Sequence, residues 1–180
     1  SEYFKVPNID LSQQGSVSFA FASRNENVNV SHLDVENARF TNQHFKITLS
    51  DLEGHFASYR VATGDFTPLS ENLKVKLSYP EQGQNSEGWL DYIGINVHRK
   101  LIWQGTPLHV INFASADSIV LGYRLKVNSG SPNALDIWDI TEPLQVSNIA
   151  PNVSIDDLTW ASDSRIIKRY IVLDPSGNFS

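Results

Sequence analysis

Alternation of apolar and polar residues with a period of two is the feature that most limits how this chain can fold. In residues 17–21, 45–49, 73–79, 93–97 and 119–127, apolar side chains recur at every second position. Successive side chains of a β-strand point to opposite faces, so each of these segments predicts a strand with one buried face. The pattern predicts a protein built from β-sheets.

Three shorter runs, "PLHVINF", "ALDIWDI" and "RIIKRYIVL", are rich in β-branched residues and also predict strands. Together these segments give about ten strands, separated by turn sequences such as "SDLEG" and "DPSGN". Helical periodicity is absent apart from a possible short turn in "SIDDLTWA", which Asp156 and Asp157 could cap. Many strands without crossover helices predict an all-β fold, an antiparallel β-sandwich of the jelly-roll, galactose-binding-like kind.

A change of composition in "VNSGSPN", residues 127 to 133, predicts a junction in the chain. Residues 1–130 are expected to form the β-sandwich domain. Residues 131–180 are too few to bury a core of their own, so they are expected to form a short β-rich C-terminal extension packed on that domain and leading toward a domain downstream.

Composition excludes several classes of function. Hydrophobic residues make up 41% of the 180 residues and charged residues 19%, as in a globular protein. The net charge of −6 and the lack of a Lys/Arg-rich run argue against a nucleic-acid partner. No apolar run approaches the ~18 residues that predict a membrane-spanning helix, so membrane insertion is not expected. The absence of cysteine excludes disulfides, thiolate metal sites and a cysteine nucleophile within these residues.

The segment "GWLDYIGINVHRKL", residues 88 to 101, combines two large aromatic side chains with a β-branched run. Strict alternation places Trp89, Asp91, Ile93, Ile95 and Val97 on one face of a strand, and Leu90, Tyr92, Asn96 and His98 on the other. The aliphatic residues make the first face the core side. Asp91 is then expected at the rim, where it could accept hydrogen bonds from a turn or from Arg99. A structural strand with a satisfied polar rim is the simplest interpretation.

The aromatic residues are the candidate ligand-binding or interface positions. Stacking on exposed rings would make Trp89, Tyr92, Trp103 and Trp138 a carbohydrate platform, although tryptophan in a sandwich is commonly part of the core. Alternatively, aromatic side chains such as Trp138, Trp160 or Tyr170 would be covered by a neighbouring domain.

Other chemistry has weaker support. Asp136, Asp139, Asp156 and Asp157 leave a structural calcium open, but no calcium-loop motif occurs and no other cofactor is expected. The five histidines are dispersed, so only the fold could assemble a zinc site. No GxSxG elbow is present, and a pair of acids for glycoside hydrolysis would depend on the fold.

Two motifs, "GWLDYIGINVHRKL" and "LDIWDITEPLQVSNI", resemble the region ahead of the peptidase domain in the gingipain-related sortases of the type IX secretion system. The second contains Trp138, Asp139, Thr141 and Pro143 in the family's pattern, and the likeness covers roughly residues 72 to 175. The resemblance implies a cell-surface or outer-membrane-associated, secreted cysteine peptidase that removes the sorting signal from cargo and helps attach the cargo to the surface. Its catalytic Cys and His would lie in a caspase-like domain downstream, so no catalytic residue is carried over to this chain.

The expected function is therefore a non-catalytic accessory or interaction region that supports or orients a downstream catalytic domain of the same polypeptide. The alternative is a carbohydrate-binding module that uses surface aromatics. Expected partners are that catalytic domain and either a cell-surface glycan or other secretion-system proteins. An autonomous hydrolase would require a pocket with a nucleophile and a base in contact.

Overall fold

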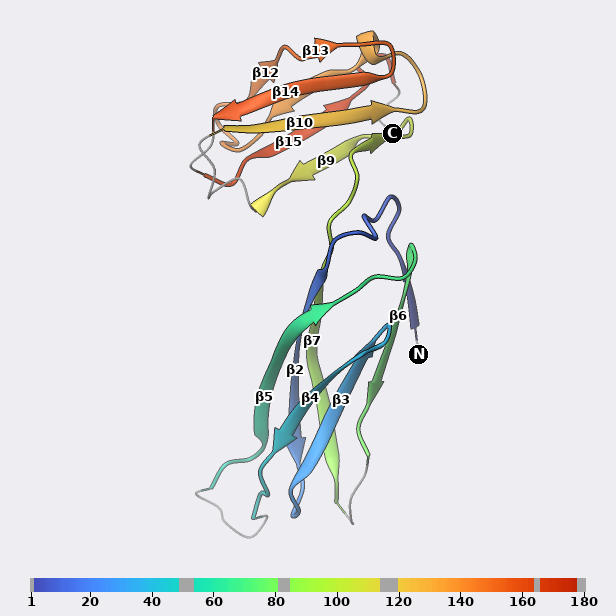
Figure 1. Ribbon diagram of the computed structural model, residues 1–180. Helices are drawn as coiled ribbons and strands as arrows, with labels where there is room; N and C mark the ends of the chain where they lie inside the picture. The colour runs from blue at the N-terminus through green and yellow to red at the C-terminus, as the bar shows by residue number, and fades with distance from the viewer. Residues whose placement is uncertain (1, 49–53, 81–84, 114–119, 164–165, 178–180) are drawn as a thin grey trace. The chain divides into compact units, whose positions relative to one another are not determined.

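The computed structural model describes residues 2–48, 54–80, 85–113, 120–163 and 166–177, which form two compact units, Ser1–Arg99 and Lys100–Ser180 (Figure 1). The strands of the first unit are β1 (Glu2–Lys5), β2 (Gly15–Arg24), β3 (Asn29–Val35), β4 (Ala38–His44), β5 (Ser58–Phe66), β6 (Asn72–Ser78) and β7 (Glu87–Asn96). The second unit contains β8 (Ile102–Trp103), β9 (Leu108–Ile111), β10 (Val120–Val127), β11 (Asp136–Asp139), β12 (Ser147–Ile149), β13 (Asn152–Val153), β14 (Asp157–Asp163) and β15 (Arg169–Leu173), with a 3-10 turn η2 (Pro132–Ala134).

The first unit is a β-sandwich whose two sheets have the strand orders β1-β6-β3-β4 and β5-β2-β7. Its pairings among the described residues are antiparallel. Strand β2 alternates strictly, and its inward side chains meet those of β3 and β6 between the sheets. The core consists of Ile9, Val17, Phe19, Phe21, Leu33, Val35, Phe66, Leu73 and Val75.

The second unit is also a sandwich, with sheet orders β13-β14-β10-β8 and β12-β11-β15-β9. Among its described pairings, β8 runs parallel to β10 and the others are antiparallel. Its buried residues form a separate core, namely Trp103, Val110, Tyr123, Leu125, Val127, Leu135, Ile137, Leu158, Trp160, Tyr170 and Val172. The predicted all-β sandwich class is confirmed.

The domain boundary differs from the one expected from the sequence. The units divide between Arg99 and Lys100, not at residue 130, and residues 131–180 belong to the same unit as residues 100–130. The Gly/Ser/Pro-rich segment that suggested a junction is the loop in which η2 joins β10 of one sheet to β11 of the other. The division itself falls within "HRKL", which has no glycine, proline or serine to mark it.

Most predicted strands are confirmed within the described residues, and two local predictions are wrong. Residues 45–48 lie outside any strand, and residue 49, like residue 119 of the predicted strand 119–127, is outside the described residues. The strand is instead β4, an edge strand with polar side chains that hide the alternation. The segment considered for a helical turn contains the start of β14, because Leu158 and Trp160 fill the core of the second unit. No helix in the described part of the chain is long and apolar enough to cross a membrane.

Candidate functional site

A β-bulge in β7 changes the face on which its aromatic residues lie. Along the β2–β7 pairing, Ala20 is opposite Tyr92 but the next residue, Phe21, is opposite Leu90. Asp91 is therefore an extra residue without a partner in the register, and it interrupts the alternation of the strand. The inserted residue shifts the alternation by one position, so the faces expected from strict alternation are exchanged beyond the bulge.

Because of this bulge, Trp89 and Tyr92 both lie on the outer face of the sheet. Trp89 is opposite Ala22 and Tyr92 is opposite Ala20, and these alanines alternate with the core residues of β2. Trp89 is 42% exposed and Tyr92 43%. The prediction that Trp89 and Asp91 share the core face with Ile93 was wrong, since strict alternation cannot anticipate an inserted residue.

The bulge makes a testable prediction for two glycines of the same strand. A Cβ on Gly88 would lie 2.7 Å from Cζ of Phe21 and 2.9 Å from Cδ1 of Tyr79, whereas a Cβ on Gly94 would meet nothing nearer than 3.8 Å. Gly88→Ala should therefore cost about 1–3 kcal/mol by overpacking. Gly94→Ala, the matched control, should change stability little. Urea denaturation of both variants measures this, and equal losses would contradict the bulged register.

We define the outer aromatic face as Phe56, Tyr59, Val61, Trp89 and Tyr92. Strands β5, β2 and β7 run side by side (Figure 1), and β5 contributes Tyr59 opposite Ala22 and Val61 opposite Ala20. The rings of Phe56 and Trp89 are 6.0 Å apart. All five side chains are at least two-fifths exposed. The central strand supplies small residues, and the large ones come from both neighbours.

Hydrogen bonds and a cation hold these rings in place. The Tyr59 hydroxyl donates to Oδ2 of Asp91 at 3.0 Å, and the hydroxyls of Tyr92 and Ser18 are 3.2 Å apart. The bond to Asp91, together with desolvation, raises the pKa of Tyr59. The guanidinium of Arg24 lies 4.6 Å from the centre of the Phe56 ring. The bulge residue Asp91 thus bonds to a tyrosine on the far side of β2, not to Arg99, which donates to the carbonyl of Pro7.

The other candidate tryptophans, Trp103, Trp138 and Trp160, lie in the second unit. Trp103 is 3% exposed and Trp160 4%, and both belong to the core. Trp160 stacks on Tyr123 with their centroids 5.1 Å apart and their planes at 10°. Trp138 is half-buried in β11 opposite Ile171. Trp103 and Trp160 therefore serve as core residues of their own unit and offer no exposed ring.

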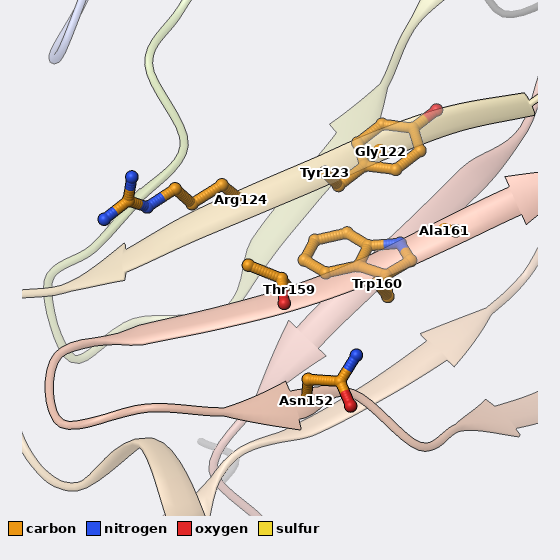
Figure 2. Close-up of a pocket in the computed structure, with 7 residues that line it drawn as sticks. All are labelled: Gly122, Tyr123, Arg124, Asn152, Thr159, Trp160 and Ala161. Carbon is orange, nitrogen blue, oxygen red and sulfur yellow. The ribbon is translucent and has the colours of Figure 1, made fainter.

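A shallow depression of about 380 Å³ lies on β10 and β14 of the second unit (Figure 2). The residues that line it are Gly122, Tyr123, Arg124, Asn152, Thr159, Trp160 and Ala161. It forms where small residues, Gly122 and Ala161, face each other across the strands. Figure 2 shows Arg124 extending away from the Trp160 ring, and Nε of Arg124 donates to Asp157 at 3.0 Å. The depression offers no nucleophile with a base beside it.

The structure does bring a serine and a histidine together, in the interior of the first unit. Nδ1 of His44 lies 3.0 Å from the carbonyl oxygen of Ser58, and Nε2 lies 3.0 Å from Oγ of Ser31. A carbonyl can only accept, so Nδ1 carries the proton and Ser31 donates to Nε2. This is the pairing of a nucleophile and its base, but all three residues are fully buried. The pair satisfies buried polar groups and cannot reach a substrate.

The buried histidine makes stability depend on pH. Burial, and secondarily the nearby charge of Arg60, lowers the pKa of His44 despite its bond to Ser58. As the pH falls below about 6.5, the unfolded chain takes up the proton before the folded one, so stability decreases toward acid. The slope should not exceed about 1.4 kcal/mol per pH unit for this one group. Denaturation at pH 7.0, 6.0 and 5.5, with NMR of the His44 ring, measures it. A ring that titrates in the ordinary range would contradict the burial.

Two of the four aspartates considered for calcium, Asp139 and Asp157, have partners within the chain. Asp139 accepts from Nζ of Lys168 at 2.8 Å and from the backbone N–H of Thr141 at 2.9 Å, and Asp157 is bonded to Arg124. Within the described ranges, no group of three His, Asp or Glu side chains is placed to hold a metal ion. The arrangement around Asp139 is that of an ion pair between the last residue of β11 and Lys168, the residue before β15.

Comparisons with known proteins give a likeness of fold. Neither the protein-family models nor the curated proteins contain a match to this sequence. Among solved structures, the crystal structure of dimeric latent PorU from Porphyromonas gingivalis is similar, with a TM-score of 0.73 and 18% sequence identity. The match covers 97% of this chain and 17% of that chain, so this chain spans about a sixth of the length of PorU. The resemblance stated from two sequence motifs is thus confirmed at the level of the fold.

Proposed function

We propose that this chain is a non-catalytic accessory region of a larger surface cysteine peptidase of the type IX secretion sortase kind, and that it supports or orients the catalytic domain. The observation that carries the proposal is the fold match, which takes in 97% of this chain and only 17% of PorU. A segment that matches such a small share of a peptidase is better suited to an accessory role than to the whole reaction. Fold likeness alone does not assign function, so the proposal also depends on the chemistry of the residues.

The residues support a role without catalysis. The sequence has no cysteine, and a cysteine peptidase needs a thiolate. The one serine–histidine pair described above, Ser31 with His44, is closed to solvent. Any chemistry of the larger polypeptide would come from residues outside this chain. The same proposal places the protein at the cell surface or outer membrane as a secreted protein, with other secretion-system proteins as candidate partners.

The surface that would contact the catalytic domain differs from the one suggested by the sequence. Trp138, Trp160 or Tyr170 was expected to be covered by a neighbour, but Trp160 and Tyr170 are 4% and 2% exposed because they fill the core of their own unit, and Trp138 is half-buried. Leu144 and Ile155, in turns of the second unit, are 99% and 91% exposed. We therefore assign the contact with the catalytic domain to these turns, because large aliphatic side chains gain most from being covered.

Aspartate substitutions at these turns test the proposal. In the isolated chain, Leu144→Asp and Ile155→Asp should leave the melting temperature nearly unchanged, since both side chains are already in water. In the whole polypeptide, they should weaken the contact and lower peptidase activity several-fold. Lys5→Asp, on an exposed strand of the first unit, is the control. Full activity of a polypeptide from which residues 1–180 are deleted would refute the accessory role.

A carbohydrate-binding role is the second candidate. One specific observation favours it: the bulge in β7 places Trp89 and Tyr92 together on an exposed sheet face. In this role, the chain would bind a carbohydrate whether or not it is also an accessory region of a peptidase.

A further inference from the structure

We propose that the outer aromatic face of the first unit binds a neutral oligosaccharide, which stacks on Trp89, Tyr92 and Tyr59 and donates hydroxyl hydrogen bonds to Asp91. The inference deepens the second candidate function, on which it rests, and it is independent of the accessory role. It depends on three features of the face: the positions of its rings, the hydrogen-bonding groups between them, and its limited area.

The rings lie on both sides of a strip of small residues. Between residues 16 and 22, the outward side chains of β2 are Ser16, Ser18, Ala20 and Ala22, so nothing large rises from the middle of this strand, and Arg24 lies at its end. Tyr59 on β5 and Trp89 on β7 are both opposite Ala22, which puts their backbones two strand spacings apart, about 10 Å. The side chains close this distance, because the Tyr59 hydroxyl reaches Asp91 of β7 and the Phe56 and Trp89 rings are 6.0 Å apart, so the face is one continuous surface. Sugar rings present flat C–H faces, which suit the faces of aromatic side chains.

Polar groups stand among the rings, as sugar hydroxyls require. The bond from Tyr59 occupies Oδ2 of Asp91 at 3.0 Å, and a carboxylate can accept about four hydrogen bonds in all, so Asp91 retains capacity for ligand hydroxyls. The hydroxyls of Tyr92 and Ser18 can each donate or accept. Because these contacts already fix the rings, little side-chain entropy is lost when a ligand binds.

The area and charge of the face favour an oligosaccharide over a protein. With the aromatic side chains 42–65% exposed, the face offers roughly 400 Å² of ring surface, about half of the ~800 Å² per partner of a stable protein interface. A second copy of this chain would also bring a second net charge of −6. Arg24, the cation at the end of the face, is 3.8 Å from Glu87 and lies against Phe56. An anionic sugar would therefore find no unpaired positive charge at that end of the face, which favours a neutral one.

Titration of the whole chain with neutral oligosaccharides tests the proposal. The probes are cellohexaose, mannohexaose, galactohexaose and a hexamer of N-acetylglucosamine, followed by tryptophan fluorescence and calorimetry. Trp103 and Trp160 are buried, and Trp138 is half-buried in the second unit, so a change in fluorescence on binding to the outer aromatic face should come mainly from Trp89. At least one probe should bind, and Trp89→Ala should weaken its affinity about tenfold or more. Tyr92→Phe, which keeps the ring, should weaken it less than Tyr92→Ala.

Phe113→Ala is the matched control, because Phe113 is an aromatic residue of the second unit that is 68% exposed. It should leave binding unchanged. Circular dichroism of each variant shows whether it is folded, and Trp89→Phe replaces Trp89→Ala if the latter is not. The proposal is overturned if no probe binds at millimolar concentration, if binding survives Trp89→Ala, or if Trp89→Ala instead abolishes dimerisation measured by sedimentation. None of these outcomes bears on the accessory role, which the deletion of residues 1–180 tests separately.

Discussion

Replacing Phe19 by alanine should lower the free energy of unfolding of the first unit by about 3–5 kcal/mol, the range typical of a buried phenylalanine. Phe19 is 0% exposed in the middle of β2 and packs between the two sheets with residues of β3 and β6. The loss combines the transfer of a large apolar side chain to water with the cavity that it leaves. Urea denaturation, followed by circular dichroism and by calorimetry, measures the effect.

The second unit should keep its own stability in that variant, because its core shares no residue with that of the first. Leu158→Ala, at a fully buried position of β14, should have the reverse effect and cost about 2–5 kcal/mol there. Val28→Ala, at a residue that is 53% exposed, should change stability by no more than about 0.5 kcal/mol. A single transition that shifts equally in both core variants would contradict two separate cores.

Replacing Asp139 by alanine should cost about 3 kcal/mol, the lower end of the range for breaking a buried ion pair. Asp139 and Lys168 have side chains that are 13% and 21% exposed, and their N–O distance is 2.8 Å. Without the carboxylate, the Lys168 ammonium stays largely shielded from water with no opposite charge to offset the cost of desolvation. The N–H of Thr141 also loses its acceptor. A double-mutant cycle of Asp139→Ala and Lys168→Met, measured by urea denaturation, gives the coupling.

The sign of the pH dependence provides an internal check. Burial alone raises the pKa of Asp139, but the bonds from Lys168 and Thr141 outweigh it and hold that pKa below its usual value. The stabilisation should therefore be complete above the usual aspartate pKa and disappear as the pH falls through the lowered one. Arg39→Ala, which breaks the exposed pair with Asp34, should cost less because solvent screens it. Equal losses for the exposed and half-buried pairs would contradict this explanation.

The class of the fold could be predicted from the sequence because alternation is a local signal. In segments such as residues 73–79, the order of apolar and polar residues indicates which side chains point inward and which point outward. The structure has a strand there, β6. The boundary between the units could not be predicted in this way. It falls at Arg99, where no turn residue interrupts the chain, whereas the turn residues at 127–133 connect two sheets of one sandwich.

The sequence identified some residues of the candidate site but not how they are arranged. Trp89 and Tyr92 were named as ligand candidates, but alternation placed them on opposite faces, and only the inserted Asp91 brings them together. Tyr59 and Phe56 were not named, because their proximity to Trp89 and Asp91 arises from the pairing of β5 with β2. Trp103 and Trp160 were named and lie in the core. Tryptophan is equally suited to a core and to a binding face, so its presence in a sequence does not separate the two.

The gene on both sides of the codons for residues 1–180 tests most directly whether this chain is an accessory region of a larger peptidase. The accessory role predicts a reading frame that continues past the codon for Ser180 into a peptidase domain with a catalytic cysteine and histidine. A stop codon soon after Ser180, with no such domain in the same frame, would contradict the role and leave glycan binding by the outer aromatic face as the leading function.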